Sequence, residues 1–442
     1  MSNGFTGLAG LIGLLLVSAC DLPDWLGDDS DNAPPLAGER IAVLDFERSI
    51  TPDPSLAEAP MNIPAAEKNP TYTHRLASIR AGYENLLVTG FDRSSSVTIG
   101  DGTGWKTSVI AQPVVAEGRV FAMDAQGVVS AHEAGAIGTR LWVSELAVMA
   151  DQDNSGGGGL AYSNGVLYVT TGYGAVMALL AQDGSLLWHR AVDVPVRAAP
   201  IAEENRVFAL TIDNQLLAFE ARTGAPLWSH RGIRETAVYL GAVSPTVENG
   251  IVIAAYTSGE VYALRAEDGS ALWSDSLIVP RRTYAASALT GINAVPLIKD
   301  NVVYTLGNGG LMAANTLATG NGVWDLEVGG YHTPWIAGEY LFVISADKQL
   351  IAVNRRNGGI KWVTELKVMD KAKDVTPFLN EPMLINGQVA VVSDDGVLRL
   401  FDAKDGKETA RHNVASGVRV APVVADGVLY LLSADASLSA YR

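Results

Sequence analysis

Short apolar runs rich in β-branched and aromatic residues alternate with turn residues from Pro113 to the C-terminus. Runs of this length and composition predict β-strands rather than helices. Turn pairs such as Asn249-Gly250 and Asp268-Gly269 separate the runs. Because these pairs tolerate the positive φ that tight hairpins need, the pattern predicts an all-β chain of antiparallel hairpins.

The pattern repeats along the chain, with one copy from Pro200 to Trp228 and the next from Pro245 to Trp273. Spacings of roughly 40 to 50 residues are typical of the four-stranded blades of β-propellers. The opening prolines are Pro113, Pro200, Pro245, Pro296, Pro334, Pro382 and Pro422, and an eighth copy carries Gly159-Leu160 instead. The closing tryptophans are Trp142, Trp188, Trp228, Trp273, Trp324 and Trp362.

Two sets of turns divide each copy into four strands, A to D. The first set is Glu117-Gly118, Asn164-Gly165, Glu204-Asn205, Asn249-Gly250, Asp300-Asn301, Ala337-Gly338, Asn386-Gly387 and Asp426-Gly427. The second set is Asp183-Gly184, Thr223-Gly224, Asp268-Gly269, Thr319-Gly320, Asn357-Gly358 and Asp405-Gly406. This division predicts an eight-bladed propeller of four-stranded antiparallel blades, with each tryptophan on strand D, packed between neighbouring blades.

The last copy ends at Tyr441-Arg442, after its strand C. A missing strand D would leave a sheet edge open, which natural proteins avoid. The strand-like stretch 86–99, Leu86 to Ile99, precedes the first copy. We expect this N-terminal segment to supply the missing strand and close the ring.

The N-terminus has the features of a secretory signal. Leu8 to Val17 is an apolar run too short to span a bilayer, and Cys20 follows small residues. Residues 1–19 are therefore interpreted as a lipoprotein signal peptide and Cys20 as the lipidated residue. The alternative is an ordinary signal with an incidental cysteine. Residues 20–85 are expected to form an acidic, proline-rich tether and an extended segment, with Thr51–Pro70 as linker, and residues 86–442 the propeller.

The charge of the chain argues against nucleic acid as a partner. The formal net charge is −16, and no cluster of Lys and Arg marks a nucleic-acid-binding face. Cys20 is the only cysteine, so the mature domain has no disulfide and must be held by its core.

Candidate metal and phosphate sites are weak. Asp151 to Gly156 resembles the start of an EF-hand loop, but Tyr162 occupies the position that needs a bidentate Glu. Gly156 to Gly159 lack the Lys-Ser/Thr of a phosphate loop. The six histidines are scattered without metal-ligand spacing. We therefore expect no metal, no cofactor and no catalytic residues.

Loop lengths differ between the two faces of the predicted ring. The A–B and C–D turns are short and uniform, whereas the D–A crossings vary, from Trp324–Pro334 to the longer Trp273–Pro296. Variable loops on a rigid scaffold usually carry function. We therefore expect the working surface on the face formed by the D–A crossings and B–C turns.

Copies with Asp/Glu, Thr/Asp-Gly and Trp in this order resemble the repeats of pyrroloquinoline-quinone (PQQ) dehydrogenases and their non-enzymatic relatives. Eight copies behind a lipobox-like Cys20 most resemble the BamB family, lipoprotein subunits of the machinery that assembles β-barrels in the outer membrane. The stretch from Asp153 to Gly174 carries part of this resemblance. It implies a lipid-anchored periplasmic scaffold that binds the barrel-insertion subunit and unfolded outer-membrane proteins.

Two points stay open at this stage. The alternative function is a periplasmic quinoprotein oxidoreductase or a ligand-sensing propeller, although the cysteine pair of the quinoproteins is missing here. The choice between inner and outer membrane is also undecided, because Asp21 after Cys20 resembles an inner-membrane retention signal of enteric bacteria.

The resemblance also implies a partner site on two adjacent D–A crossings. Matched by position before Pro245 and Pro296, it falls on Tyr239, Leu240, Ile292 and Asn293. The arginine and the two aspartates of the family pattern are absent, because Gly291 and Asn293 occupy the acidic positions. The alternative is that Tyr239 and Leu240 begin strand A and pack inward.

Overall fold

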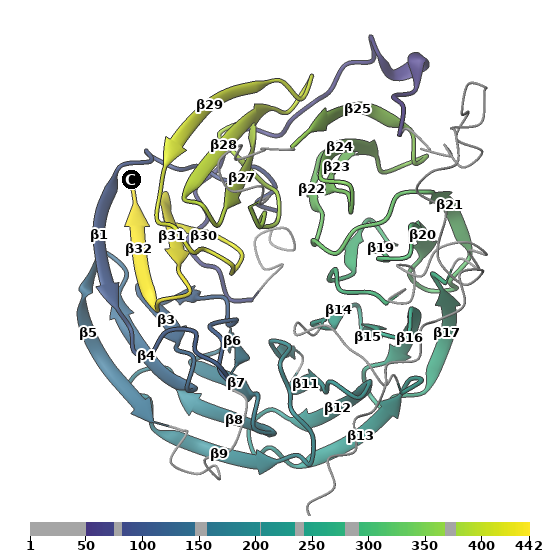
Figure 1. Ribbon diagram of the computed structural model, residues 1–442. Coiled ribbons are helices and arrows are strands. Elements are labelled where there is room, and N and C mark those ends of the chain that lie inside the picture. Colours follow the sequence, from purple (N-terminus) through teal and green to yellow (C-terminus); the bar gives the residue numbers. More distant parts are fainter. Residues whose placement is uncertain are drawn as a thin grey trace, which may run out of the picture. The chain divides into compact units, whose positions relative to one another are not determined.

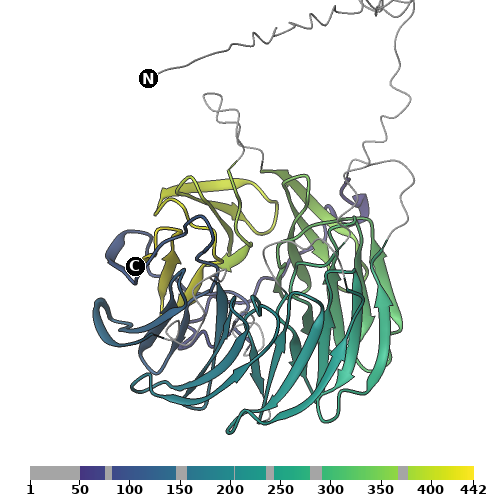
Figure 2. The ribbon, with the colours of Figure 1, turned by 60° about the horizontal axis from the view of Figure 1, so that its bottom comes forward.

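The structure is a computed structural model that describes residues 50–74, 82–145, 157–203, 205–234, 243–278, 291–366 and 377–442. The described residues form eight four-stranded antiparallel sheets, arranged as blades around a common axis (Figures 1 and 2). The predicted eight-bladed propeller is therefore confirmed. Strand A of each blade lies nearest the axis and strand D at the rim (Figure 1). None of the described helices has the length and apolar character needed to cross a membrane.

The strands follow one another blade by blade. Blades 1 and 2 contain β2 (Val114–Ala116), β3 (Arg119–Met123), β4 (Val128–Glu133), β5 (Ala136–Glu145), β6 (Gly158–Ser163), β7 (Val166–Thr171), β8 (Ala175–Leu180) and β9 (Leu186–Ala191). Blades 3 and 4 contain β10 (Ile201–Glu203), β11 (Arg206–Leu210), β12 (Gln215–Glu220), β13 (Pro226–Arg231), β14 (Thr246–Glu248), β15 (Ile251–Ala255), β16 (Glu260–Arg265) and β17 (Ala271–Ser276).

The remaining blades have the same order. Blades 5 and 6 contain β18 (Leu297–Lys299), β19 (Val302–Leu306), β20 (Met312–Thr316), β21 (Gly322–Leu326), β22 (Trp335–Ala337), β23 (Tyr340–Ile344), β24 (Gln349–Asn354) and β25 (Ile360–Glu365). Blades 7 and 8 contain β26 (Met383–Ile385), β27 (Gln388–Ser393), β28 (Val397–Asp402), β29 (Glu408–Asn413), β30 (Val423–Ala425), β31 (Val428–Leu432), β32 (Ser437–Tyr441) and β1 (Arg93–Thr98). A 3₁₀ turn, η3 (Pro54–Leu56), precedes them.

The hairpin turns follow the sequence pattern with one correction. Both central residues have positive φ at Asn249-Gly250 and in five further A–B turns, as a type I′ hairpin requires. In blade 6 the prediction of Ala337-Gly338 is wrong by one residue. Ala337 ends β22 and the turn is Gly338-Glu339, of which only Gly338 has positive φ.

The N-terminal strand β1 and the C-terminal strand β32 meet in blade 8, where they pair antiparallel (Figure 1). The predicted closure is confirmed, although the closing strand covers only Arg93–Thr98 of the expected 86–99. The preceding Leu86 pairs instead with Ile385 of blade 7. The stretch 51–70, which was expected to be a linker, contacts the ring. Its residue Asn69 is fully buried and donates a hydrogen bond to Val424 of blade 8.

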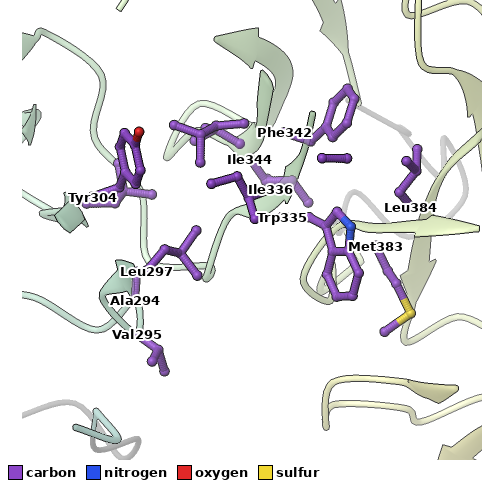
Figure 3. Close-up of a cluster of buried hydrophobic side chains, with 14 of the residues drawn as sticks. Ala294, Val295, Leu297, Tyr304, Trp335, Ile336, Phe342, Ile344, Met383 and Leu384 are labelled. Atoms are coloured by element: carbon purple, nitrogen blue, oxygen red, sulfur yellow. The ribbon is translucent and has the colours of Figure 1, made fainter. Parts of the chain in front are cut away.

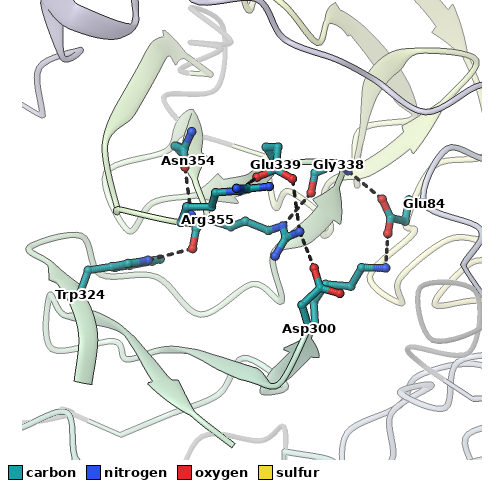
Figure 4. Close-up of polar contacts among 9 residues, drawn as sticks. Glu84, Asp300, Trp324, Gly338, Glu339, Asn354 and Arg355 are labelled. Carbon is teal, nitrogen blue, oxygen red and sulfur yellow. Dashed lines mark hydrogen bonds and ion pairs between the residues drawn. The ribbon is translucent and has the colours of Figure 1, made fainter. Parts of the chain in front are cut away.

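Each closing tryptophan joins its blade to the next one. The indole N–H of Trp228 on β13 donates to the carbonyl of Ala266 in blade 4, at 3.0 Å. The same bond, between 2.7 and 3.0 Å, recurs at the other five joints (Figure 4 shows the fifth, between blades 5 and 6). The five pairs are Trp142–Ala181, Trp188–Ala221, Trp273–Leu317, Trp324–Arg355 and Trp362–Ala403. We call this contact the tryptophan latch.

A β-bulge in strand D turns the indole towards the next blade. Ala218 pairs with Trp228 but Phe219 pairs with Pro226, so Leu227 is the extra residue. Because the bulge changes the local twist, the ring of Trp228 faces blade 4, while Leu227 points outwards and is 46% exposed. Equivalent bulges occur in the other strands D of blades 1 to 7.

Apolar side chains fill the space between blades. Tyr304 of blade 5, Phe342 of blade 6 and Leu384 of blade 7 belong to one buried cluster that continues through several blades. Figure 3 shows these side chains together with Trp335 and Met383. A continuous core of this kind lets the propeller remain folded without disulfides, since residues 50–442 contain no cysteine.

Two joints lack the latch, and both border blade 8. By register, Ala410 in blade 7 and Ser95 in blade 8 stand where the other blades have tryptophan. At the joint from blade 8 to blade 1, Tyr430 donates from its hydroxyl to the carbonyl of Ala134, at 3.0 Å. Blade 8 is therefore held differently from the rest of the ring.

The latch can be tested with two glycines of similar backbone conformation. A Cβ at Gly269 would lie 2.6 Å from the ring of Trp228, whereas a Cβ at Gly250 meets nothing within 4 Å. Both have positive φ, +74° and +71°, so each Gly→Ala change costs about 1–2 kcal/mol from backbone strain. We expect Gly269→Ala to lose about 1–3 kcal/mol more through displacement of the indole. Equal urea midpoints for the two variants would contradict the proposed packing role.

A buried ion pair adds to the joint between blades 6 and 7. Arg399, 6% exposed, donates to the carbonyl of Leu366 in blade 6 at 3.2 Å and to Glu408 at 2.7 Å. Burial alone would raise the pKa of Glu408. Hydrogen bonds and charges from Arg411 and Arg399 outweigh this and lower that pKa to about 2.

This pair predicts a pH-dependent stability. Because the folded pKa of Glu408 lies below its usual 4.5, the ionised carboxylate stabilises the fold above about pH 4.5. That contribution is lost as the pH falls towards 2. We expect Glu408→Gln to lower the free energy of unfolding at pH 7 by about 1–2 kcal/mol, allowing for solvent screening. In denaturant titrations, the difference in the free energy of unfolding between Glu408→Gln and wild type should shrink below pH 4.5. A difference that stays constant with pH would contradict the stabilising role of the ionised Glu408.

Candidate functional site

Exposed apolar side chains are distributed unequally between the two faces of the ring. Among the described residues, five of the eleven exposed large apolar side chains lie on D–A crossings. They are Trp105, Ile233, Ile278, Tyr331 and Phe378. The other six lie on rim strands D, and none lies on an A–B or C–D turn. We call the surface formed by the D–A crossings and B–C turns the crossing face.

One turn supports the two crossings that carry the predicted partner residues. This is the B–C turn of blade 4, Tyr256–Glu260, which we call the blade 4 turn. Glu260 accepts from the backbone N–H of Ile233, at 2.7 Å, where the crossing from blade 3 begins. The carbonyl of Gly259 accepts from Leu277, at 2.9 Å, where the crossing to blade 5 begins. The bases of both crossings are thus fixed to one support.

Asn214 holds the first crossing from the opposite side. Its amide nitrogen donates to the carbonyl of Ile233, at 2.6 Å, and its amide oxygen accepts from Thr257 N–H, at 3.1 Å. Ile233 therefore has both backbone groups hydrogen-bonded while its side chain is 59% exposed. An apolar side chain held in this way loses little conformational entropy when it binds a partner.

An aromatic cluster fills the space beneath this crossing. His230 and Tyr256 share a hydrogen bond of 2.7 Å, and the His230 ring lies 4.5 Å from that of Tyr262. Burial lowers the pKa of His230, although the charge of Glu260 opposes the shift. The imidazole is therefore mostly neutral near pH 7, and its ring packs against the rings of Tyr256 and Tyr262.

The second crossing ends in a buried stretch. Ile292 pairs with Gly307 of blade 5, and its side chain is fully buried. A Cβ on Gly291 would lie 2.3 Å from the carbonyl oxygen of Thr257, so this residue allows the crossing to pass close to the blade 4 turn. The crossing is thereby anchored at its end as well as at its beginning.

The four residues predicted as partner contacts differ in where the structure places them. Tyr239 and Leu240 lie outside the described residues. Ile292 offers no surface to a partner because it is fully buried. Asn293 is partly exposed, and its buried amide oxygen has no hydrogen-bond partner. The structure places the bases of the two crossings together on the blade 4 turn.

Sequence reasoning missed Ile233, Ile278, Asn214 and Glu260. One signal for Asn214 was present: it occupies, with φ of 60°, the B–C turn position where blades 1, 2 and 4 have glycine. Asparagine tolerates this conformation and adds a side chain that can bind backbone groups. No comparable signal marks Ile233 or Ile278, because their exposure depends on how the crossings leave the ring.

An open hollow of about 640 Å³ lies between Asn62 and Gln388 of blade 7. Two smaller cavities near the inner strands have volumes of about 10 Å³, one beside Tyr72 and Pro422 and one beside His74 and Pro200. Such a volume holds roughly one water molecule, so a quinone fits neither cavity. Across the described residues, no three His, Cys, Asp or Glu side chains form a group that could hold a metal ion.

Comparison with known proteins gives the same architecture. An outer membrane protein assembly factor BamB of Yersinia pestis is 25% identical over 352 residues, covering 78% of this chain and 87% of that protein. BamB of Escherichia coli K12 is 25% identical over 350 residues, covering 76% and 87%. The crystal structure of BamB from Moraxella catarrhalis superposes with a TM-score of 0.65 at 19% identity, covering 80% of this chain and 97% of that one.

A dehydrogenase shares the fold alone. The quinohemoprotein alcohol dehydrogenase of Comamonas testosteroni superposes with a TM-score of 0.63 at 13% identity, covering 80% of this chain and 76% of that one. The family model described as outer membrane protein assembly factor BamB matches residues 125–364 and 373–442, well over half of the sequence. The chain therefore belongs to the BamB family of PQQ-like repeat propellers.

Proposed function

We propose that this protein is a non-enzymatic scaffold subunit of the machinery that assembles β-barrel proteins in the outer membrane. It is lipid-anchored through Cys20 at the periplasmic side of that membrane. It binds the barrel-insertion subunit, and unfolded outer-membrane proteins are a further partner class. Family membership supports the assembly role, and the names of the relatives from Yersinia pestis and Escherichia coli support the outer membrane.

The observation that carries the proposal is that, among the described residues, every exposed large apolar side chain outside the rim strands lies on a D–A crossing. Ile233 and Ile278 are 59% and 46% exposed and flank the blade 4 turn. Exposed apolar residues on rigid supports are typical of protein-binding sites. We call the proposed contact surface the crossing patch: Ile233, Ile278, Tyr239, Leu240 and Asn293.

Within the crossing patch, Ile292 acts as support. Its burial anchors the backbone next to Asn293, a residue that is itself partly exposed. Because the charged residues of the family pattern are absent, apolar contacts rather than ion pairs provide the affinity. Burying one isoleucine side chain at an interface contributes about 1.5–3 kcal/mol before entropic costs.

A pull-down from native membranes tests the crossing patch. We expect Ile233→Asp with Ile278→Asp to reduce the barrel-insertion subunit that co-purifies by about tenfold or more, because two charges would be buried against apolar surface. The double change Tyr239→Ala with Asn293→Arg should act in the same direction.

Leu227→Asp is the matched control. Leu227 is 46% exposed, like Ile278, but lies on the rim rather than on the crossing face. The control should retain the wild-type yield. If folded crossing-patch variants also co-purify at the wild-type yield, the partner site is elsewhere.

The anchor has its own test. We expect Cys20→Ala to abolish lipid attachment and to release most of the protein from the membrane fraction, because no described helix could hold it there. The readouts are gel mobility and fractionation with Cys20→Ser as a second variant. Unchanged mobility together with unchanged membrane retention would show that Cys20 carries no lipid.

A further inference from the structure

The segment before β1 has a course that the family match does not cover, because that match begins at residue 125. Residues 60–74 and 82–89 lie against the inner strands of the ring, and we call these two stretches the strap. They contact each other where the N–H of Glu67 donates to Asn85 and that of Leu87 donates to Glu67, both at 2.9 Å. The strap is thus a two-limbed element bound inside the ring.

One limb crosses the joint from blade 7 to blade 8. Leu86 exchanges two backbone bonds of 2.9 Å with Leu384 and Asn386 of blade 7. The side chain of Asn386 binds both backbone groups of Val88, at 3.1 and 2.8 Å. The next residue, Thr89, donates to the carbonyl of Gly427 in blade 8, at 3.0 Å.

The other limb crosses the joint from blade 8 to blade 1. Asn69 is fully buried, and its side chain donates to the carbonyl of Val424 in blade 8, at 2.6 Å. Its own carbonyl accepts from Asp426, at 2.6 Å. Three residues later, Tyr72 exchanges two backbone bonds of 2.7 and 2.8 Å with Val115 of blade 1.

A buried carboxylate fixes the strap to blades 5 and 6. Glu84 is 7% exposed and accepts from Lys299 of blade 5, at 2.5 Å, and from the N–H of Gly338 in blade 6, at 2.7 Å (Figure 4). Its backbone carbonyl accepts from the indole of Trp335, at 2.7 Å. These bonds hold the limb in place before it reaches blades 7 and 8.

The two joints that the strap crosses from the inside are the same two that lack a tryptophan latch at the rim. We propose that the strap holds the ring closed at blade 8 in place of the missing latches, and that blade 8 and the strap open together before the other blades. The bonds of the strap are mostly to backbone groups, so they depend on the position of the limb rather than on one side chain. Opening therefore releases both joints at once.

Native-state hydrogen exchange of the full-length protein tests this proposal. We expect Asn69→Ala to speed exchange of the amides in β30, β31, β32 and β1 by roughly five- to tenfold, the effect of one lost buried hydrogen bond. Blades 3 and 4 should exchange as in wild type. The matched variant Trp228→Phe removes one latch bond and should give the opposite distribution, with faster exchange in blades 3 and 4.

A uniform increase across all blades in Asn69→Ala, or none in blade 8, would overturn the proposal. Wild type provides a second test that needs no variant. Hydrogen exchange is measured while the denaturant concentration is raised within the range in which the protein stays folded. The amides of residues 84–89 and of blade 8 should then share one opening transition, at a lower concentration than the transitions of blades 2 to 5. If blade 8 opens only in global unfolding, the strap is not a separate closing device. None of these outcomes depends on the proposed scaffold function.

Discussion

The ring depends on one contact repeated at six joints: an indole that donates its N–H to a carbonyl of the next blade while its face covers a turn glycine. The hydrogen bond sets the angle between neighbouring sheets, and the glycine allows the ring to approach closely enough to exclude water. Since both halves are in every one of these joints, neighbouring blades repeat nearly the same rotation, and a closed ring follows from the repetition.

This rigidity has a direct effect on the crossing face. The blade 4 turn is rigid because its strands belong to a latched blade, and it in turn holds Ile233 and Leu277 at fixed positions. The crossings can therefore differ in length and sequence from joint to joint without changing the framework that presents them.

Much of the architecture was predictable because it is local. Asn249-Gly250 fixes a hairpin by its φ values, and Trp228 marks strand D by its distance from Thr223-Gly224. The course of the strap was not predictable, because a proline-rich stretch without periodicity does not indicate which inner strands it will meet. The burial of Ile292, which was predicted as a partner contact, was not predictable for a related reason. A single apolar residue at the end of a crossing fits either the core or the surface until its pairing with Gly307 is known.

The pairing of β1 with β32 in one blade affects when the ring can close during folding. Ser96 and Ser439, whose hydroxyls lie 3.1 Å apart in this pairing, are 343 residues apart in sequence. This pair cannot form until the chain is available over its whole length from β1 to β32. Contacts over such a separation form slowly because a long loop must close before they stabilise anything. Until this pair forms, blade 8 lacks its outer strand and the edge of β32 is open, an arrangement that natural sheets avoid because such an edge can pair with another chain.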